Sequence, residues 1–277
     1  MKKFLLLFVC LALYAAPIYK LQAEEANGAE DQAQASTAYV SNSQEWEAAL
    51  NNQNIAYIIL TNDITVPPAP NIYYEGVDQK PHALQIQMAE GRNLTIQGNY
   101  TITTRPMHFN LQEGALVILD GPTFARYSGA AEWTFHFIFV HGSGTFILRS
   151  GGILADSSFT NAAGVLLRGS VTFLMEGGLI SGATAAAYNR FGTRAGVTLR
   201  ENTAFVMTGG SITSNDIGIS IDAPSYFYTV RVEFIAGDIS NNLRYNFSGN
   251  KWGTSRGYTQ RVSFDGEEPF VSGRESL

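Results

Sequence analysis

The sequence is poor in cysteine, because Cys10 is the only one among its 277 residues. Cys10 lies in an N-terminal apolar stretch, so the rest of the chain can form neither a disulfide nor a thiolate metal site. Charged residues make up only 15% of the chain, and no segment after the N-terminal stretch is apolar enough to cross a bilayer. The fold must therefore be held together by its core and its backbone hydrogen bonds.

The first residues, MKKFLLLFVCLALYAAPIYKLQA, have the pattern of a secretory signal peptide. Lys2 and Lys3 precede an apolar run of roughly 13 residues, whereas a membrane span needs about 20. We expect cleavage after Ala23, with residues 1–23 as the signal peptide. Lipidation of Cys10 is disfavoured because LFVC lacks the small residue expected before it. The prediction is an exported protein, periplasmic, at the cell surface or secreted, with no stable membrane insertion after cleavage.

Acidic residues outnumber basic ones. Removing residues 1–23 takes three of the 18 Lys and Arg residues and none of the 24 Asp and Glu residues, which leaves a net charge of −9. This charge repels phosphate and argues against nucleic acid or an anionic membrane as a partner. Residues 24–37 are acidic, lack large apolar side chains and are predicted to be a disordered spacer. Residues 38–277 are long enough for one sizeable domain.

Glycine and aromatic residues are abundant, with 27 Gly, 17 Phe and 13 Tyr, and this composition favours strands and tight turns. An eight-residue template recurs at intervals of about 30 residues. Its positions are apolar, any, apolar, any, small, Gly, any and Ile. The copies that fit it are FILRSGGI (146–153), FLMEGGLI (173–180), FVMTGGSI (205–212) and VEFIAGDI (232–239). Looser copies are LTIQGNYT (94–101), VILDGPTF (117–124) and VSFDGEEP (262–269), whose Gly98, Gly121 and Gly266 align with the small residue.

Each repeat predicts one coil of a solenoid. A second short strand precedes most copies by six or seven residues, and no crossover helix fits inside most units. We predict an all-β fold, a right-handed single-stranded parallel β-helix of about 7–8 coils with equivalent strands about 4.8 Å apart. The predicted inward columns are Leu94, Val117, Phe146, Phe173, Phe205, Val232 and Val262, and beside them Ile96, Leu119, Leu148, Met175, Met207, Phe234 and Phe264.

Two further elements follow from the pattern. The segment SQEWEAAL (43–50) predicts a short amphipathic helix, with Ser43 as N-cap, that covers the first coil.

Asn215 and Asn241 follow two of the glycine corners. Asparagine at such a place either adopts the turn geometry or stacks in a ladder inside the turn, and both roles are structural.

The repeat resembles that of the secreted bacterial right-handed parallel β-helix proteins of the pectate-lyase-like superfold. More narrowly, GGSITSN and GDISNN resemble the Gly-Gly-x-Ile-x-x-Asn repeats of bacterial adhesin-like surface proteins, and the likeness covers about residues 38–270. It implies an exported, non-catalytic surface protein that contacts a polysaccharide or a host surface molecule. The superfold also includes polysaccharide lyases and glycoside hydrolases, so the fold alone does not decide the function. The sequence contains neither a DD pair nor a GHG motif, which argues against the two best-known enzymatic versions.

Outward positions carry the candidate functional residues. Alternation places Asp120, Arg149 and Glu176 in one column on successive coils. These three residues form either an ion-pair ladder that sets the register, or the catalytic groups of a lyase or hydrolase that acts on an acidic polysaccharide. Arg168 and Arg200 form a second outward column, either as ordinary solvated arginines or as a binding site for an acidic glycan.

Aromatic and histidine residues give weaker signals. Tyr226 and Tyr228 are candidates for stacking on sugar rings, with core filling as the alternative. His136 and His141 flank a strand, FIFV, and could suggest a metal ligand or a general base. Because they are five residues apart on a strand, we expect them on opposite sides. No metal and no cofactor is expected.

Overall fold

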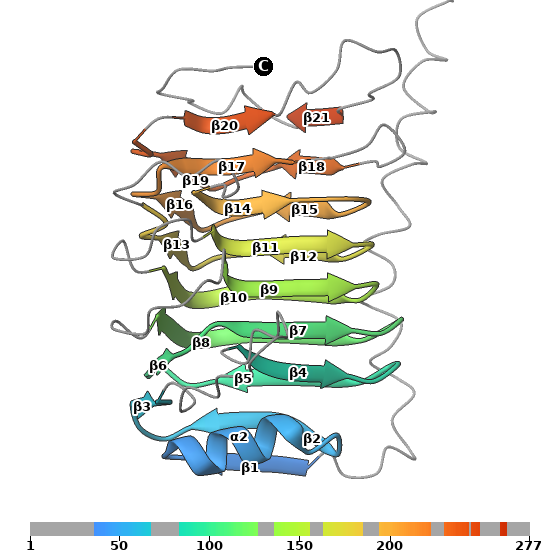
Figure 1. The fold of residues 1–277 in the computed structure, drawn as a ribbon, viewed down its shortest axis with the longest axis vertical. Helices are drawn as coiled ribbons and strands as arrows, with labels where there is room; N and C mark the ends of the chain where they lie inside the picture. The colour runs from blue at the N-terminus through green and yellow to red at the C-terminus, as the bar shows by residue number, and fades with distance from the viewer. Residues whose placement is uncertain are drawn as a thin grey trace, which may run out of the picture. The chain divides into compact units, whose positions relative to one another are not determined.

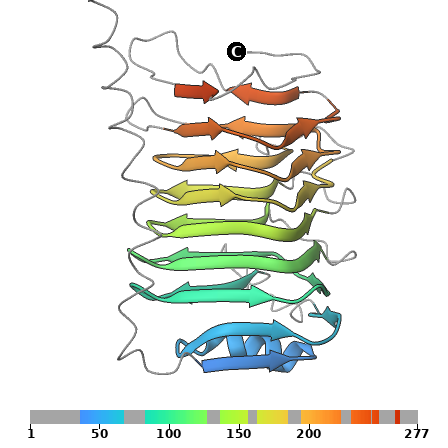
Figure 2. The ribbon, with the colours of Figure 1, turned by 180° about the vertical axis from the view of Figure 1, so that it is seen from behind.

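The structure is a computed structural model that describes residues 36–67, 83–126, 136–155, 163–184, 194–222, 230–243, 245–249 and 261–264. Within these ranges the chain forms one α-helix, α2 (Ser43–Asn51), and a stack of parallel strands (Figures 1 and 2). The predicted signal peptide lies outside the described residues. The last two residues of the predicted spacer, Ser36 and Thr37, begin the first strand.

Two parallel sheets run along the stack. The larger sheet follows the path β1 (Ser36–Val40), β2 (Ile55–Leu60), β5 (Asn93–Gln97), β8 (Leu116–Arg126), β10 (Thr145–Leu154), β12 (Thr172–Met175), β15 (Ala204–Met207), β18 (Arg231–Phe234) and β21 (Arg261–Phe264). The second sheet contains β4 (Leu84–Met88), β7 (Met107–Leu111), β9 (His136–Gly142), β11 (Ala163–Gly169), β14 (Ala195–Leu199), β17 (Ile217–Ile221) and β20 (Tyr245–Gly249).

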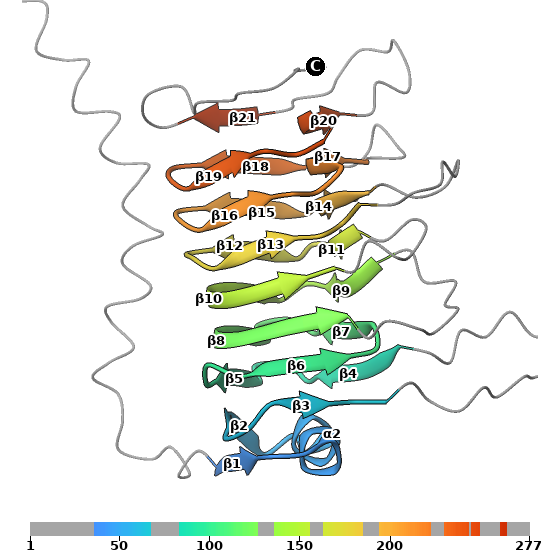
Figure 3. The ribbon, with the colours of Figure 1, turned by 90° about the vertical axis from the view of Figure 1, so that its left-hand side faces the viewer.

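A third column of short strands completes each coil (Figure 3). The C-terminal halves of β8 and β10 belong to this column, where they pair with each other and with the short strands β6 and β13. Its separate members are β3 (Ile64–Thr65), β6 (Thr101–Thr104), β13 (Leu179–Ser181), β16 (Ser211–Thr213) and β19 (Asp238–Ser240). The chain thus passes from the second sheet to the larger sheet and then to a short strand in every full coil. The prediction of a parallel β-helix with about 7–8 coils is confirmed.

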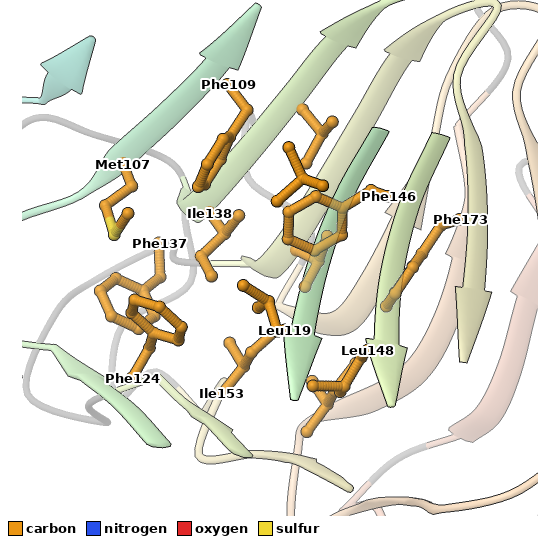
Figure 4. Close-up of a cluster of buried hydrophobic side chains, with 14 of the residues drawn as sticks. Met107, Phe109, Leu119, Phe124, Phe137, Ile138, Phe146, Leu148, Ile153 and Phe173 are labelled. Carbon is orange, nitrogen blue, oxygen red and sulfur yellow. The ribbon is translucent and has the colours of Figure 1, made fainter. Parts of the chain in front are cut away.

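The core is the interior of the coil, and both predicted columns fill it. Every member of the two columns is at most 8% exposed, from Leu94 to Val232 in one column and from Ile96 to Phe234 in the other. Phenylalanine rings follow one another along the axis. The ring centroids of Phe146 and Phe173 are 5.6 Å apart (Figure 4), and those of Phe173 and Phe205 are 5.3 Å apart. Each such side chain contributes roughly 1.5–3 kcal/mol through burial. The backbones of Val262 and Phe264 continue the register, and their side chains lie outside the description.

Glycines form the corners between the larger sheet and the short strands. Gly151, Gly178, Gly210 and Gly237 have φ between 78° and 119°, a region that side chains disfavour. Gly98 and Gly121 share this conformation, with φ of 112° and 111°. Gly98 and Gly121 are therefore equivalent to the second residue of each corner, such as Gly178. The prediction aligned them with the first residue, the small one of the template, and this alignment is wrong. The reason is a local register shift between β8 and β10. Asp120 pairs with Ser150, whereas on either side of the corner Leu119 pairs with Leu148 and Thr123 with Gly152, so the corner keeps its length but its pairing moves by one residue.

The asparagines after the corners have separate roles. Asn241 has a φ of 54° and makes the turn, as Ser214 does one coil earlier with 58°. Asn215 and Asn242 instead point inward and form a ladder, with Asn215 fully buried. Gly196 leaves the space for this ladder, because a Cβ there would lie 2.8 Å from Nδ2 of Asn215.

The helix α2 closes the first coil. Trp46, Ala49 and Leu50 are buried on one face of the helix, and the Trp46 ring lies 6.1 Å from that of Phe124. The N-cap is Asn42 and not Ser43, because the Asn42 Oδ1 accepts the backbone N–H groups of the second and third helical residues at 3.1 and 3.0 Å. Asparagine and serine are equivalent in this role, so the sequence pattern did not distinguish the two adjacent positions.

Candidate functional site

The predicted column of charges on the larger sheet is an ion-pair ladder in the structure. Asp120 of β8, Arg149 of β10 and Glu176, directly after β12, lie on three successive coils. Arg149 Nε is 2.9 Å from Glu176 Oε2, and Nη1 is 3.9 Å from Asp120 Oδ2. Asp120 also accepts a hydrogen bond from Ser150 Oγ at 2.9 Å. The Arg149 side chain is 44% exposed, so solvent weakens these pairs.

The position of Arg149 limits what this column can do chemically. Glycoside hydrolysis needs space between two carboxyl groups for the sugar ring, and for a water molecule in the inverting mechanism. Here the guanidinium group occupies the space between Asp120 and Glu176. Through these contacts the side chain of Arg149 joins neighbouring coils.

The second predicted column lies on the outer face of the second sheet. Arg168 Nε donates to Glu201 Oε1 at 2.5 Å, and Arg200 Nε donates to Asp222 Oδ2 at 2.8 Å. In both pairs the acid lies on the coil that follows. The Arg168 side chain remains 58% exposed. Tyr226 and Tyr228, the other candidates for carbohydrate binding, lie outside the described residues.

A third pair of the same kind is more buried. Arg194 Nη1 is 3.5 Å from Asp216 Oδ2, and their side chains are 12% and 6% exposed. Like Arg168 and Arg200, Arg194 binds an acid that is 22 to 33 residues further along the chain. The sequence pattern identified the ladder on the larger sheet but did not reveal these pairs, since their partners lie in turns beyond the repeat template.

The coiled architecture agrees with the comparison to known families. Residues 37–145 match a family model described as "Putative pectate lyase-like adhesive domain". The fold is a pectate-lyase-like parallel β-helix. The match spans the chain from β1 to the first residue of β10, whereas the glycine pairs at 177–178 and 209–210 lie beyond it. No curated protein matches the chain, and no solved structure matches it.

A group of rings on the second sheet was not predicted. His108 of β7, and His136, Phe139 and His141 of β9, lie together on its outer face. The Phe139 ring centroid is 5.2 Å from that of His108, 4.8 Å from that of His136 and 5.0 Å from that of His141. The expectation that His136 and His141 face opposite sides is therefore wrong.

The reason is a break in the alternation of β9. Phe137 and Ile138 are adjacent, and both are fully buried in the core (Figure 4). The two adjacent inward residues shift the alternation by one position. His136, before the break, and His141, five residues later, therefore point to the same face of the sheet. Two consecutive large apolar residues in FIFV were the only sequence signal of the break.

Burial affects the ionisation of these histidines. The pKa of His108 is lowered from 6.5 to about 4, mainly because burial disfavours the charged ring and also because His141 is close. Burial also lowers the pKa of His141, with a smaller contribution from the positive charge of Arg168. We expect His108 to be neutral at physiological pH.

The described residues contain no group of three or more His, Cys, Asp or Glu side chains that could hold a metal ion. In the same ranges no helix is both long enough and apolar enough to cross a membrane.

Proposed function

We propose that the chain is an exported, non-catalytic, adhesin-like surface protein that contacts a polysaccharide or a host surface molecule. The observation that carries this proposal is the match of residues 37–145 to an adhesive-domain family. The predicted signal peptide supports export, and the parallel β-helix supplies long, flat outer faces of the kind that a large ligand can lie against.

For the contact surface we propose the exposed row of Arg168 and Arg200 on the second sheet, with Tyr226 and Tyr228 as candidate stacking residues. A glycan carboxylate or sulfate would compete with Glu201 and Asp222 for the two guanidinium groups. Arg168 is the better placed of the two, because more of its side chain is exposed.

The alternative function is a polysaccharide lyase or glycoside hydrolase that uses Asp120, Arg149 and Glu176. One observation favours it, namely that the side chain of Arg149 is 44% exposed and lies between two carboxylates on adjacent coils. The closed ion-pair geometry supports the structural role instead, since the three charges satisfy one another.

One experiment separates the two functions. The purified chain is incubated with a panel of acidic and neutral polysaccharides, and both binding and release of shorter products are measured. We expect saturable binding without turnover, with affinity for acidic polysaccharides reduced in Arg168→Ala and Arg200→Ala. Arg231→Ala, which removes an exposed arginine from the larger sheet, is the matched control. Product release that disappears in Arg149→Ala or Glu176→Ala would show that the protein is an enzyme.

A further inference from the structure

Two histidines on adjacent strands direct the same ring atom toward each other. His108 belongs to β7 and His136 begins β9, which pairs with β7 in parallel. Their Nε2 atoms are 3.0 Å apart, and their ring centroids are 5.0 Å apart. Both side chains are partly exposed at the outer face of the second sheet. Neither residue takes part in the proposed contact surface.

We propose that His108 and His136 together bind one divalent first-row transition metal ion through their Nε2 atoms. Imidazole nitrogens bind such ions at 2.0–2.1 Å. Two ligands at this distance on one ion are about 2.9 Å apart at an angle of 90° and about 3.3 Å apart at a tetrahedral angle. The observed separation of 3.0 Å lies within this interval, so the pair needs almost no movement to chelate an ion.

The surroundings of His108 hold its ring in place. Its Nδ1 lies 3.0 Å from the side-chain amide of Gln85, on the preceding strand β4. A half-turn of that amide presents Oε1 instead of Nε2, and Oε1 accepts the Nδ1–H of a ring bound to metal through Nε2. The Phe139 ring contacts both histidine rings and limits their rotation. Gln85 and Phe139 are thus positioning residues of the proposed site.

The ligand set selects the class of metal. Imidazole suits Zn²⁺, Cu²⁺ and Ni²⁺, whereas Ca²⁺ and Mg²⁺ require oxygen ligands. Because the described residues add no third His, Cys, Asp or Glu to the pair, water would occupy the other coordination positions. These positions face outward from the sheet, where a donor group from another molecule could replace the water.

The proposal is tested with the full chain, produced without a polyhistidine tag, freed of metal with a chelator and titrated with Zn²⁺ by calorimetry. We expect one Zn²⁺ per chain, with affinity reduced roughly tenfold or more in His108→Ala and in His136→Ala. The double variant should lose little more than either single variant, since both residues hold one ion. His141→Ala is the matched control, because it removes a histidine from the same face and should keep its affinity.

A second measurement does not depend on the folding of any variant. In NMR spectra of the imidazole nitrogens of the wild-type chain, Zn²⁺ should shift Nε2 of His108 and His136, with a smaller change at His141. Absence of saturable Zn²⁺ binding would overturn the proposal and leave the pair as a hydrogen bond between two rings. An equal loss of affinity in His141→Ala would also overturn it, because the histidines would then bind metal without a defined pair.

Discussion

The side-chain amide of Asn215 donates a hydrogen bond to Oδ1 of Asn242, on the next coil, across 3.2 Å. Asn215 is fully buried, and its own Oδ1 accepts the backbone N–H of Ala183, on the coil before, at 3.0 Å. Its Nδ2 also lies within hydrogen-bonding distance of the carbonyl groups of Ile180 and Thr213. One side chain therefore links three coils inside the turn.

Replacing Asn215 with alanine should be strongly destabilising. The substitution leaves a buried N–H and two buried carbonyl groups without this partner and opens a small cavity. We expect the free energy of unfolding to fall by about 2–4 kcal/mol in urea denaturation. Asn241→Gly is the control: Asn241 is exposed and has positive φ, so glycine should be tolerated. Equal effects of the two substitutions would contradict the ladder.

Gly210→Ala tests the close approach of the coils at their corners. A Cβ at this position would lie 2.6 Å from the backbone of Gly177, in addition to the strain of a φ of 86°. We expect a loss of at least about 3 kcal/mol, or failure to fold. In Gly91→Ala only the backbone strain remains, because no atom lies within 4 Å of the added Cβ, and the loss should be about 1 kcal/mol. Thermal denaturation of both variants provides the comparison.

Phe173→Ala removes the middle ring of the stack formed with Phe146 and Phe205. The lost burial and the cavity should cost about 3–5 kcal/mol. Leu174→Ala, at the adjacent outward and half-buried position, should cost about 1 kcal/mol. Denaturation combined with hydrogen exchange should show the loss concentrated in the coils next to Phe173, since a solenoid is stabilised by contacts between neighbouring coils. A similar cost at both positions would argue against the inward and outward assignment.

The ion pairs should differ in strength according to their exposure. Arg149→Met breaks the exposed ladder with Asp120 and Glu176, and should change the free energy of unfolding by less than about 1 kcal/mol. Arg194→Met leaves Asp216, whose side chain is 6% exposed, without this cation, and should cost about 3–5 kcal/mol. Chemical denaturation at low and high salt checks both values. Only the Arg149 effect should disappear at high salt.

Stability should decrease in mild acid because of His108. Its pKa is lowered from 6.5 to about 4 in the folded chain, so between these values the unfolded chain binds a proton that the folded chain does not. The free energy of unfolding should therefore fall as the pH decreases from about 6.5 to about 4. After allowance for solvent screening of the ring, this contribution is about 2 kcal/mol.

The measurement is urea denaturation at several pH values in the presence of a chelator. His108→Gln cannot take up the proton, so its stability should change less than that of the wild-type chain across this pH range. Parallel pH profiles for the two proteins would show that another group causes the acid sensitivity.

The coiled fold was predictable because its signals are local. The template around Phe146, Phe173 and Phe205 places inward and outward residues by alternation within one strand, and this pattern needs no knowledge of other coils. The charge column of Asp120 and Arg149 followed from the same template, because both positions lie within the repeat. The N-cap of α2 and the alignment of Gly98 were misplaced by one residue, since sequence patterns locate boundaries less well than elements.

The sequence by itself determined the parallel β-helix, its inward columns and its glycine corners, because strand alternation and turn geometry depend on neighbouring residues. Only the tertiary structure decided which side chains meet on different coils. His108 contacts His136 across 28 residues, and Arg168 binds Glu201 across 33 residues. These contacts depend on the register of stacked strands, on the length of the intervening segments and on the break in alternation at Phe137. The register and the segment lengths are not set within a single repeat, so the contacts on the outer surface could be assigned only from the stacked coils.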